Sequence, residues 1–554
     1  MSRSVPIGID LGTTNSAVAW VHGAGHTEML ANEFGDWLTP SAVFFTPRGV
    51  TVGREAIRAA EYAPEAVIES PKRFMGQVDC GRVIHGHAVP PELAQAFILR
   101  QLRHDIDAVI HEPYEVVITV PAFFDEVRRQ RTVAAGEMAG LKVLDVINEP
   151  TAAALAFGEH LGFLGSAGLA ELRPDAPINP DIPINIMVYD LGGGTFDVTV
   201  ICLKRDDVRV LASDGDVLLG GLDWDRRLVD YAAQKFESKH FMDPREDPET
   251  LARLMHLANE AKHSLVSRRA TTISVNYARE QLDVEVSRET FSDLNESLVD
   301  RTMMTVRDVM SAAGRDWTDL DHVLLVGGAT RMPQIAAALE RETKMAPRAV
   351  VNPDEAVARG AAVCAATRLA VRDGGISQLR CRIVDVSSHS LGIQGIDRST
   401  DARVNSIIIP RNSPLPAVVT RRFVIKEKDQ NSIAIRVLEG ELTRPEDCIV
   451  LGKAVLRDLP ENLGFGQPVD VTYEYDSGGR LGVQAALPGT EHRLEVEFHR
   501  DQALDRDDIQ AWRRALWEGQ GQTFEQMLDQ FIRGSAPGDQ SDGDPSKEDQ
   551  SARD

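Results

Sequence analysis

The sequence predicts a two-lobed α/β domain followed by an antiparallel β-sandwich and a short helical segment. Strands alternate with helical patterns from Pro6 to about Leu369, which is typical of layered α/β domains. Within this region, two segments repeat one design of a buried strand, an Asp, a Gly-rich turn and a return strand. After residues 373–375 the pattern changes to short alternating strands with turn residues between them, which indicates a β-sandwich.

Length, composition and charge narrow the class of protein. A chain of 554 residues is too long for one hydrophobic core and predicts roughly three domains. The net charge of −24 argues against nucleic acid as a partner. The chain begins directly with a predicted strand and no apolar stretch approaches about 18 residues, so we expect a cytoplasmic protein without a membrane partner. The five scattered cysteines are expected to be reduced structural thiols.

The C-terminal third divides into smaller units. Strands are predicted at 404–409, 422–426, 432–438, 469–475 and 481–486. Two short helices follow, and the second begins at Thr523 with Gln526 in a capping box and ends at Gly534. The last stretch has almost no apolar residues and is expected to be a disordered acidic tail. The predicted boundaries are 1–377 for the α/β domain, 378–388 for a linker, 389–500 for the sandwich, 501–534 for the helical segment and 535–554 for the tail.

The repeated design is the first chemical signal. Glycines let backbone N–H groups approach phosphate oxygens, hydroxyls donate further hydrogen bonds, and carboxylates hold Mg²⁺ mostly through its waters. An ordinary β-hairpin is the less favoured alternative for either turn alone, and it fails for the pair, because nothing structural demands the same order twice. The pair therefore predicts two facing loops that clamp a nucleoside triphosphate between two lobes. The residues concerned are Asp10, Gly12, Thr13, Thr14 and Asn15 in the first copy and Asp190, Gly192, Gly193, Gly194, Thr195 and Asp197 in the second.

A third Gly-rich turn follows the predicted strand at 323–326. Gly327, Gly328 and Ala329 suit the nucleoside end of a ligand, because backbone there lies close to the base, and the Arg331 guanidinium would stack on it. This turn is a weak signal by itself. Together, the three turns resemble the ATPase superfold shared by actin, sugar kinases and DnaK-type chaperones, so the α/β domain is expected to be an actin-like ATPase.

Longer motifs resemble the DnaK-type (70-kilodalton heat-shock) chaperone family and not actin or the kinases. They are VPAFF at 120–124, INEPTAAALA at 147–156, LGGLDWD at 219–225, NPDEAVA at 352–358, SLGI at 390–393 and VLEGE at 437–441, so the resemblance extends to about residue 500. A shortened stretch between Lys72 and Val117 and a short C-terminus are most similar to the HscC-type bacterial branch. The resemblance implies a stress-related chaperone that binds unfolded or extended client peptides and couples Mg-ATP hydrolysis to their capture and release.

Position by position, the resemblance implies a hydrolytic centre. Lys72 and Glu149 would position and polarise the attacking water beside the γ-phosphate. From the residues alone, a lone lysine such as Lys72 is usually a solvated surface charge, and the end of a strand is the alternative for Glu149; their placement inside the family motifs favours the hydrolytic roles instead. The resemblance also implies a catalytic role for Asp190 and Thr195, and a magnesium and water network formed by Asp10, Asp190 and Asp197, with K⁺ as a second candidate ion. It implies nucleotide contacts for Lys262 and Asp354, and an allosteric relay through Pro121 and Arg129.

The helix expected to contact adenosine departs from the family pattern. Where the family usually has Glu, Arg and Ser, this chain has Asn259, His263 and Val266, and only Lys262 is kept. Losing a charged ribose partner and a polar base contact costs about 1–3 kcal/mol each, which predicts weaker or altered adenine recognition. The alternative is that neighbouring residues compensate.

Two departures concern protein partners. Asp145 stands where the family typically has an Arg that meets the aspartate of a J-domain cochaperone. An acid facing an acid repels, which predicts poor stimulation by a standard J-protein, or a non-standard partner with a matching change. A helix-surface Asp that contacts nothing is the alternative. In the linker, usually a run of leucines that docks on the ATPase lobe, Arg382 dilutes the apolar character.

The client groove and its lid also differ from the family. Ile396 and Lys426 align with the arch that closes over bound peptide, Ile433 aligns with the central pocket, and Ile393 belongs to the same groove. An arch lysine favours acidic or polar clients. The helical segment at 501–534 would be a truncated lid, so we expect fast peptide exchange. A nucleotide exchange factor is a further candidate partner.

Two other classes of protein remain open from the sequence. A sugar-kinase-type phosphotransferase would use the same nucleotide clamp, but it does not need the β-domain that begins at about residue 389. An ATP-binding adaptor with a decayed ATPase would explain Asn259, His263 and Asp145, whereas the intact catalytic residues oppose it.

Overall fold

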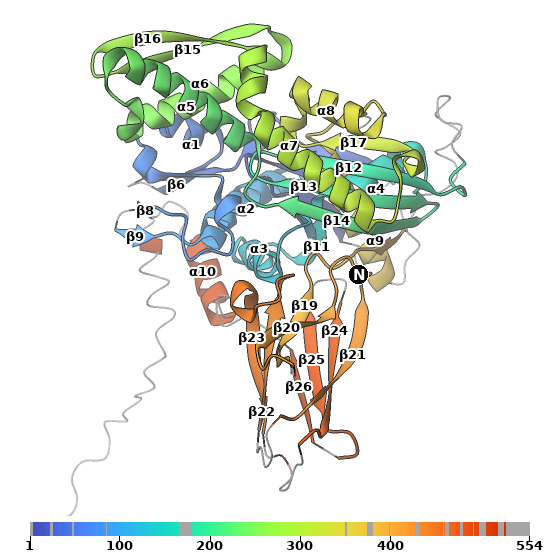
Figure 1. The fold of residues 1–554 in the computed structure, drawn as a ribbon. Helices are drawn as coiled ribbons and strands as arrows, with labels where there is room; N and C mark the ends of the chain where they lie inside the picture. The colour runs from blue at the N-terminus through green and yellow to red at the C-terminus, as the bar shows by residue number, and fades with distance from the viewer. Residues whose placement is uncertain are drawn as a thin grey trace, which may run out of the picture.

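The computed structural model of the chain describes residues 4–22, 26–46, 49–84, 86–164, 179–348, 352–373, 381–397, 399–426, 432–457, 459, 465–476, 480–490, 492–497, 506–518 and 526–527. The predicted tail at 535–554, most of the predicted helix at 523–534 and the beginning of the predicted linker lie outside these residues. Figure 1 shows two α/β lobes with a β-domain below them.

The first lobe is built on a six-stranded mixed sheet. Its strands lie in the order β11 (Val143–Asn148), β10 (Tyr114–Val120), β1 (Val5–Asp10), β2 (Asn15–Val21) and β3 (Thr27–Leu30), and β4 (Leu38–Pro40) pairs with β2. The turn after Asp10 returns the chain directly, so β1 and β2 are antiparallel, whereas β1 and β10 are parallel. The remaining elements of this lobe are α1 (Arg54–Ala59), α2 (Pro91–Val109), α3 (Glu126–Met138), the sheet of β6 (Gly49–Val52), β5 (Ala42–Thr46) and β7 (Val67–Glu69), and the short hairpin of β8 (Val83–Ile84) and β9 (His87–Ala88).

The second lobe repeats this plan. Its strands lie in the order β17 (His322–Val326), β12 (Ile184–Leu191), β13 (Phe196–Lys204), β14 (Asp207–Asp216) and β18 (Arg382–Val384). A Gly-rich turn again joins an antiparallel pair, β12 and β13, and β17 lies parallel to β12. The remaining elements are α5 (Gly221–His240), α6 (Pro248–Ser267), α7 (Arg288–Ala312), α8 (Pro333–Thr343) and the hairpin of β15 (Ala270–Tyr277) and β16 (Glu280–Ser287).

Two helices, α4 (Glu149–Leu161) and α9 (Ala356–Arg372), hold the lobes together. α4 follows a strand of the first lobe but packs on β12 and β13 of the second, whereas α9 follows the second lobe and packs on β1 and β2 of the first. The two helices also contact each other. A Cβ at Gly360 would lie 1.7 Å from the carbonyl oxygen of Ala152, so only glycine permits this close crossing.

The β-domain is a sandwich of two antiparallel sheets. One sheet has the order β20 (Arg403–Ile409), β19 (Leu391–Ile396), β22 (Ile433–Glu439) and β23 (Ile449–Leu456), and the other has the order β21 (Ala417–Val424), β24 (Pro468–Tyr475), β25 (Leu481–Ala486) and β26 (Arg493–Glu497). The buried Tyr473 hydroxyl links the two sheets by donating a hydrogen bond to the Gly392 carbonyl at 2.8 Å. The strand predicted at 422–426 is wrong in its bounds, because β21 begins at Ala417 and ends at Val424. The sequence did not predict β19, β23 or β26.

Residues 382–384 of the predicted linker form part of the second lobe's sheet. β18 pairs in parallel with β14, and Ile383 packs against the buried cluster beneath. Arg382 is exposed. One polar residue in the linker therefore leaves its strand pairing intact, because a strand that buries one face needs apolar residues only at alternate positions.

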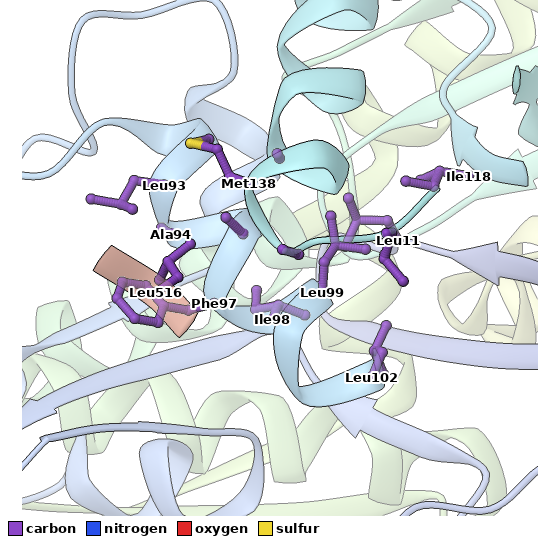
Figure 2. Close-up of a cluster of buried hydrophobic side chains, with 14 of the residues drawn as sticks. Leu11, Leu93, Ala94, Phe97, Ile98, Leu99, Leu102, Ile118, Met138 and Leu516 are labelled. Atoms are coloured by element: carbon purple, nitrogen blue, oxygen red, sulfur yellow. The ribbon is translucent and has the colours of Figure 1, made fainter. Parts of the chain in front are cut away.

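The helix α10 (Arg506–Glu518) packs on α3 and contacts side chains of α2 in the first lobe. Trp512 and Leu516 are buried there in one hydrophobic cluster with Phe97, as Figure 2 shows for Leu516 and Phe97. Arg100 Nη1 donates to the Leu516 carbonyl at 3.0 Å, one of the last carbonyls of the helix, which have no partner inside it. In this structure the described part of the predicted lid therefore lies on the first lobe and not over the β-sandwich.

The predicted fold class is confirmed by these elements: two α/β lobes, an antiparallel β-sandwich and a short helical segment. All five cysteines are free. Within the described ranges, the structure contains no helix whose length and apolarity would allow it to cross a membrane.

Candidate functional site

The three predicted Gly-rich turns meet in one cleft between the two lobes. The predicted nucleotide-binding residues that line this cleft are Gly12, Thr13, Thr14, Asn15, Gly192, Gly193, Thr195, Lys262, Gly327, Gly328, Ala329, Arg331 and Asp354. Asp10, Glu149 and Asp190 line it as well. Gly194 lies next to Gly220 and the stem of Arg73, and Asp197 accepts a hydrogen bond from the backbone N–H of Phe123 at 3.1 Å.

The first two loops approach each other so closely that glycine is required. A Cβ at Gly193 would lie 1.7 Å from the Thr14 hydroxyl oxygen of the opposite lobe. Within the first loop, a Cβ at Gly12 would lie 2.0 Å from the Asn15 carbonyl oxygen, so the tight turn itself also requires glycine. The loops therefore face each other at contact distance with backbone and hydroxyl groups between them. Such a cradle supplies the N–H and O–H donors that phosphate oxygens accept.

Lys72 and Glu149 form a buried ion pair next to the cleft. The Lys72 side chain is only 3% exposed and also donates to the Leu11 carbonyl at 2.7 Å. Lys72 lies in a short helical turn, Pro71–Phe74, and Glu149 is the first residue of α4. The two alternatives that the sequence left open, a solvated lysine and a glutamate that ends a strand, are therefore both wrong.

Besides Glu149, three buried carboxylates, those of Asp10, Asp190 and Asp197, lie near enough to interact electrostatically with the Lys72 ammonium group. Burial, followed by the charge of Glu149, raises the pKa of Asp10 to about 7 and that of Asp197 to about 8. The same two causes raise the pKa of Asp190 well above its usual range. So many buried acids are costly without further positive charge, and the set therefore fits a site that binds a cation.

Those acids are too dispersed to chelate a metal by themselves. Within the described residues, no three His, Cys, Asp or Glu side chains form a cluster that could hold an ion directly. Magnesium readily keeps several of its waters and takes its other ligands from phosphates. The residues present therefore fit an ion that is held through water and a nucleotide.

The opposite end of the cleft is lined by the residues expected to contact adenosine. Arg331 is held by Asp354, with its Nη2 at 2.7 Å from a carboxylate oxygen. Lys262 is held by the buried Asp225, with its Nζ at 2.7 Å from a carboxylate oxygen, and Asn259 donates to the same oxygen at 3.2 Å.

His263 and Val266 also line this end. Burial, and then the charge of Lys262, lowers the pKa of His263. The neutral imidazole and the valine leave this end of the cleft with fewer charged groups than the family pattern has. This is consistent with weaker adenine recognition, which stays a prediction.

The predicted relay residues lie between the cleft and the linker. Pro121 directly follows β10, and Arg129 in α3 donates through Nη1 to Asn148 at 2.5 Å. Asn148 and Thr151 in turn donate to the buried linker residue Asp385, at 3.0 and 3.2 Å. A continuous chain of hydrogen bonds therefore joins α3, the start of α4 and the linker.

Asp145 is neither on a helix nor without contacts. It lies in β11 and forms an ion pair with Arg368 of α9, with 2.9 Å between Nε and a carboxylate oxygen. The alternative reading of Asp145 as a helix-surface residue that contacts nothing is therefore wrong. The pair is partly buried, so the negative charge expected at this surface is partly neutralised by Arg368.

The predicted groove residues occupy different environments. Ile393 is buried in the sandwich core, and Ile433 is half-buried against it. Ile396 is exposed, and Lys426 is exposed and forms an ion pair with Asp401 of the loop between β19 and β20. Lys426, which the resemblance aligned with the arch, is therefore already paired with an acid.

The sequence did not single out several residues that line the cleft. Gly221, Leu222 and Asp225 come from the start of α5, where Gly221 and Leu222 donate backbone hydrogen bonds to Gly192 and Gly193 of the second loop. The Gly-Gly pair just before a helix was the available signal, because it permits this close backbone approach.

A two-lobed domain whose glycine loops face each other across an acidic, lysine-containing cleft defines a nucleotide-binding ATPase, here joined to a β-sandwich. The family model described as Hsp70 protein matches residues 6–80 and 79–527. Among curated proteins, the chain is similar to chaperone protein DnaK of Halobacterium salinarum, with 35% identity over 92% of this chain and 77% of the relative. The proteins of the same name from Thermotoga petrophila and Thermosipho africanus are 36% identical over 91% of this chain and 82% and 81% of the relatives.

The chain belongs to the Hsp70 family. It is an ATP-dependent chaperone with ATPase activity, as the resemblance of its motifs implied. These relatives are not assigned to the HscC-type branch, which stays a prediction.

Proposed function

We propose that Mg-ATP binds in the interlobe cleft with its phosphates between the two facing loops and its adenosine between Arg331 and α6. Lys72 and Glu149 then position the attacking water, and the loop donors stabilise charge on the transferred phosphoryl group. The observation that supports this proposal most directly is the buried Lys72–Glu149 pair next to both loops. Asp10, Asp190, Asp197 and Thr195 complete the site.

A bound magnesium ion would neutralise phosphate charge and relieve the repulsion among the buried acids. Asp10 and Asp190 line the cleft and would hold its waters. K⁺ stays a second candidate ion. A cytoplasmic location likewise stays a prediction from the sequence.

We further propose that hydrolysis alters client binding through the docked linker. β18 joins the second lobe's sheet, and Asp385 connects it by hydrogen bonds to the helix that begins with Glu149. A movement of Glu149 on hydrolysis would therefore reach the linker, and through it the β-domain, by way of the start of α4 and Asp385. The clients are unfolded or extended peptides, held at Ile396, Lys426 and Ile433, and nucleotide moves the equilibrium only by binding two states unequally.

Labelled extended peptides, tested with and without Mg-ATP, check both sites and their coupling. ATP is expected to accelerate peptide release at least about tenfold, because only differential binding shifts a two-state equilibrium. Ile433→Asp should weaken peptide binding and leave ATP hydrolysis intact, whereas Val418→Asp, at an exposed position of β21, should change neither. Peptide release that is equally fast with and without ATP would contradict the coupling.

A second prediction concerns a J-domain cochaperone. A standard J-protein should stimulate the wild-type ATPase poorly because its aspartate would meet Asp145. Asp145→Arg alone would place two guanidinium groups together, so the sharper variant combines Asp145→Arg with Arg368→Asp and reverses the pair. This double variant should gain stimulation in steady-state ATPase assays. Equal stimulation of the wild type and the double variant would show that Asp145 does not determine the partner.

The sugar-kinase and adaptor alternatives each leave a feature of the structure without a function. A kinase does not need a β-domain whose linker pairs with the nucleotide-binding lobe. An adaptor with a decayed ATPase does not need a buried lysine paired beside the loops. Stoichiometric loss of ATP to a small hydroxylated acceptor would favour the kinase, and no single-turnover hydrolysis would favour the adaptor. A nucleotide exchange factor stays a candidate partner.

A further inference from the structure

Arg73, next to Lys72 in the same helical turn, spans the two lobes. Its Nη2 donates to the Leu218 carbonyl at 2.7 Å and lies 3.1 Å from an Asp223 carboxylate oxygen of the second lobe. The Arg73 and Asp223 side chains are 11% and 17% exposed, so most of this pair is shielded from solvent. We call this set of contacts the Arg73–Asp223 latch.

The second-lobe end of the latch is joined to the second glycine loop. Asp223, in the first turn of α5, accepts from the Gly220 backbone N–H at 2.8 Å. Its neighbour Leu222 donates to the Gly193 carbonyl at 2.8 Å. Any movement of Asp223 is therefore transmitted to the loop that faces Thr14.

The stem of Arg73 also covers this loop from behind. A Cβ at Gly194 would lie 2.8 Å from Arg73 Cγ and 2.4 Å from Thr13 Cγ2, and a Cβ at Gly220 would lie 2.5 Å from Gly194 Cα. Arg73, Gly194 and Gly220 are therefore stacked in contact. Val217, beside the latch, packs against the hydrophobic cluster of the first lobe.

One nitrogen of the latch is not satisfied. Arg73 Nη1 is buried and has no hydrogen-bond partner among the described residues. A buried donor without a partner weakens the closed arrangement, so the latch holds the lobes together without fixing them permanently.

We propose that the Arg73–Asp223 latch holds the lobes closed at the phosphate end and thereby sets how fast ADP leaves. This inference rests on the proposed placement of the nucleotide between the glycine loops. Arg73 is a positioning residue, because it does not line the cleft and acts through Asp223 and Gly194. Breaking the pair would let α5 and the second loop move away from the first lobe, which lowers affinity through faster dissociation more than through slower hydrolysis.

The test measures dissociation of fluorescently labelled ADP after a chase with unlabelled ADP, next to single-turnover ATP hydrolysis, on the full chain. Arg73→Ala and Asp223→Asn should each accelerate ADP release at least about fivefold, and hydrolysis of bound ATP should stay within about threefold of wild type. An Asn at 223 keeps an oxygen for the Gly220 N–H, so this variant removes the charge but not the helix cap. Arg73→Lys, which keeps the charge, should release ADP at a rate between those of the wild type and Arg73→Ala.

The matched control is Arg226→Ala. Arg226 lies 3.8 Å from the same Asp223 carboxylate, but it belongs to the same helix and is largely exposed, so ADP release should not change. The double variant of Arg73→Ala with Asp223→Asn should release ADP no faster than the faster single variant, because both remove one interaction. Additive effects would overturn the proposal, and so would unchanged ADP release in both single variants. A wild-type protein that binds no labelled ADP would instead refute the proposed nucleotide site.

Discussion

Lys72→Met is expected to lower the single-turnover rate of ATP hydrolysis by about 10²- to 10³-fold, the usual cost of removing one preorganised charge from a reacting centre. The substitution keeps most of the side-chain length and removes the ammonium group that binds the Leu11 carbonyl and Glu149. ATP should still bind, because the glycine loops and the adenosine end of the cleft are untouched. Rapid-quench measurement of one turnover, with nucleotide binding measured separately, distinguishes the two effects.

Two further variants control for charge and for nonspecific damage. Lys72→Arg keeps the charge but does not fit a site shaped around one nitrogen, so an intermediate rate is expected. Lys204→Met, at an exposed position, should hydrolyse ATP like the wild type. If Lys72→Met hydrolyses bound ATP at the wild-type rate, then Lys72 is not part of the hydrolytic centre.

Trp512→Ala is expected to release α10 from the first lobe. Truncating a buried tryptophan typically costs about 3–5 kcal/mol, and a helix of this length has little stability of its own in water. Trp512 is 3% exposed and lies in the same cluster as Phe97 and Leu516. Backbone amides of α10 should then exchange with deuterium much faster than in the wild type, as measured by hydrogen–deuterium exchange.

The neighbouring arginine provides the matched comparison. Arg513 is exposed, whereas Trp512 next to it is buried, so Arg513→Ala should leave α10 docked and its amides protected. Protected amides in Trp512→Ala would mean that the helix is held by other contacts, such as the hydrogen bond from Arg100.

The two glycine loops were predictable because the requirement for glycine and threonine in each loop arises within a few consecutive residues. Where a strand ends in Asp and backbone must approach a phosphate, glycine and threonine appear at fixed spacing, and a single sequence records that spacing. The sandwich strands with strict alternation, such as β24 and β25, were predictable for the same reason. The bounds of β21 were not, since none of its eight residues is buried and three consecutive exposed residues interrupt its alternation.

The sequence by itself determined the family, the fold class and the order of loops that form the cleft, because these depend on motifs contained within a few residues. Only the tertiary structure decided that Lys72 pairs with Glu149, 77 residues away, that Arg73 reaches Asp223, 150 residues away, and that Asp145 is held by Arg368. It also decided that α10 packs on the first lobe. Partners so distant along the chain are chosen by how the two lobes pack around α4 and α9, and no local spacing records that packing.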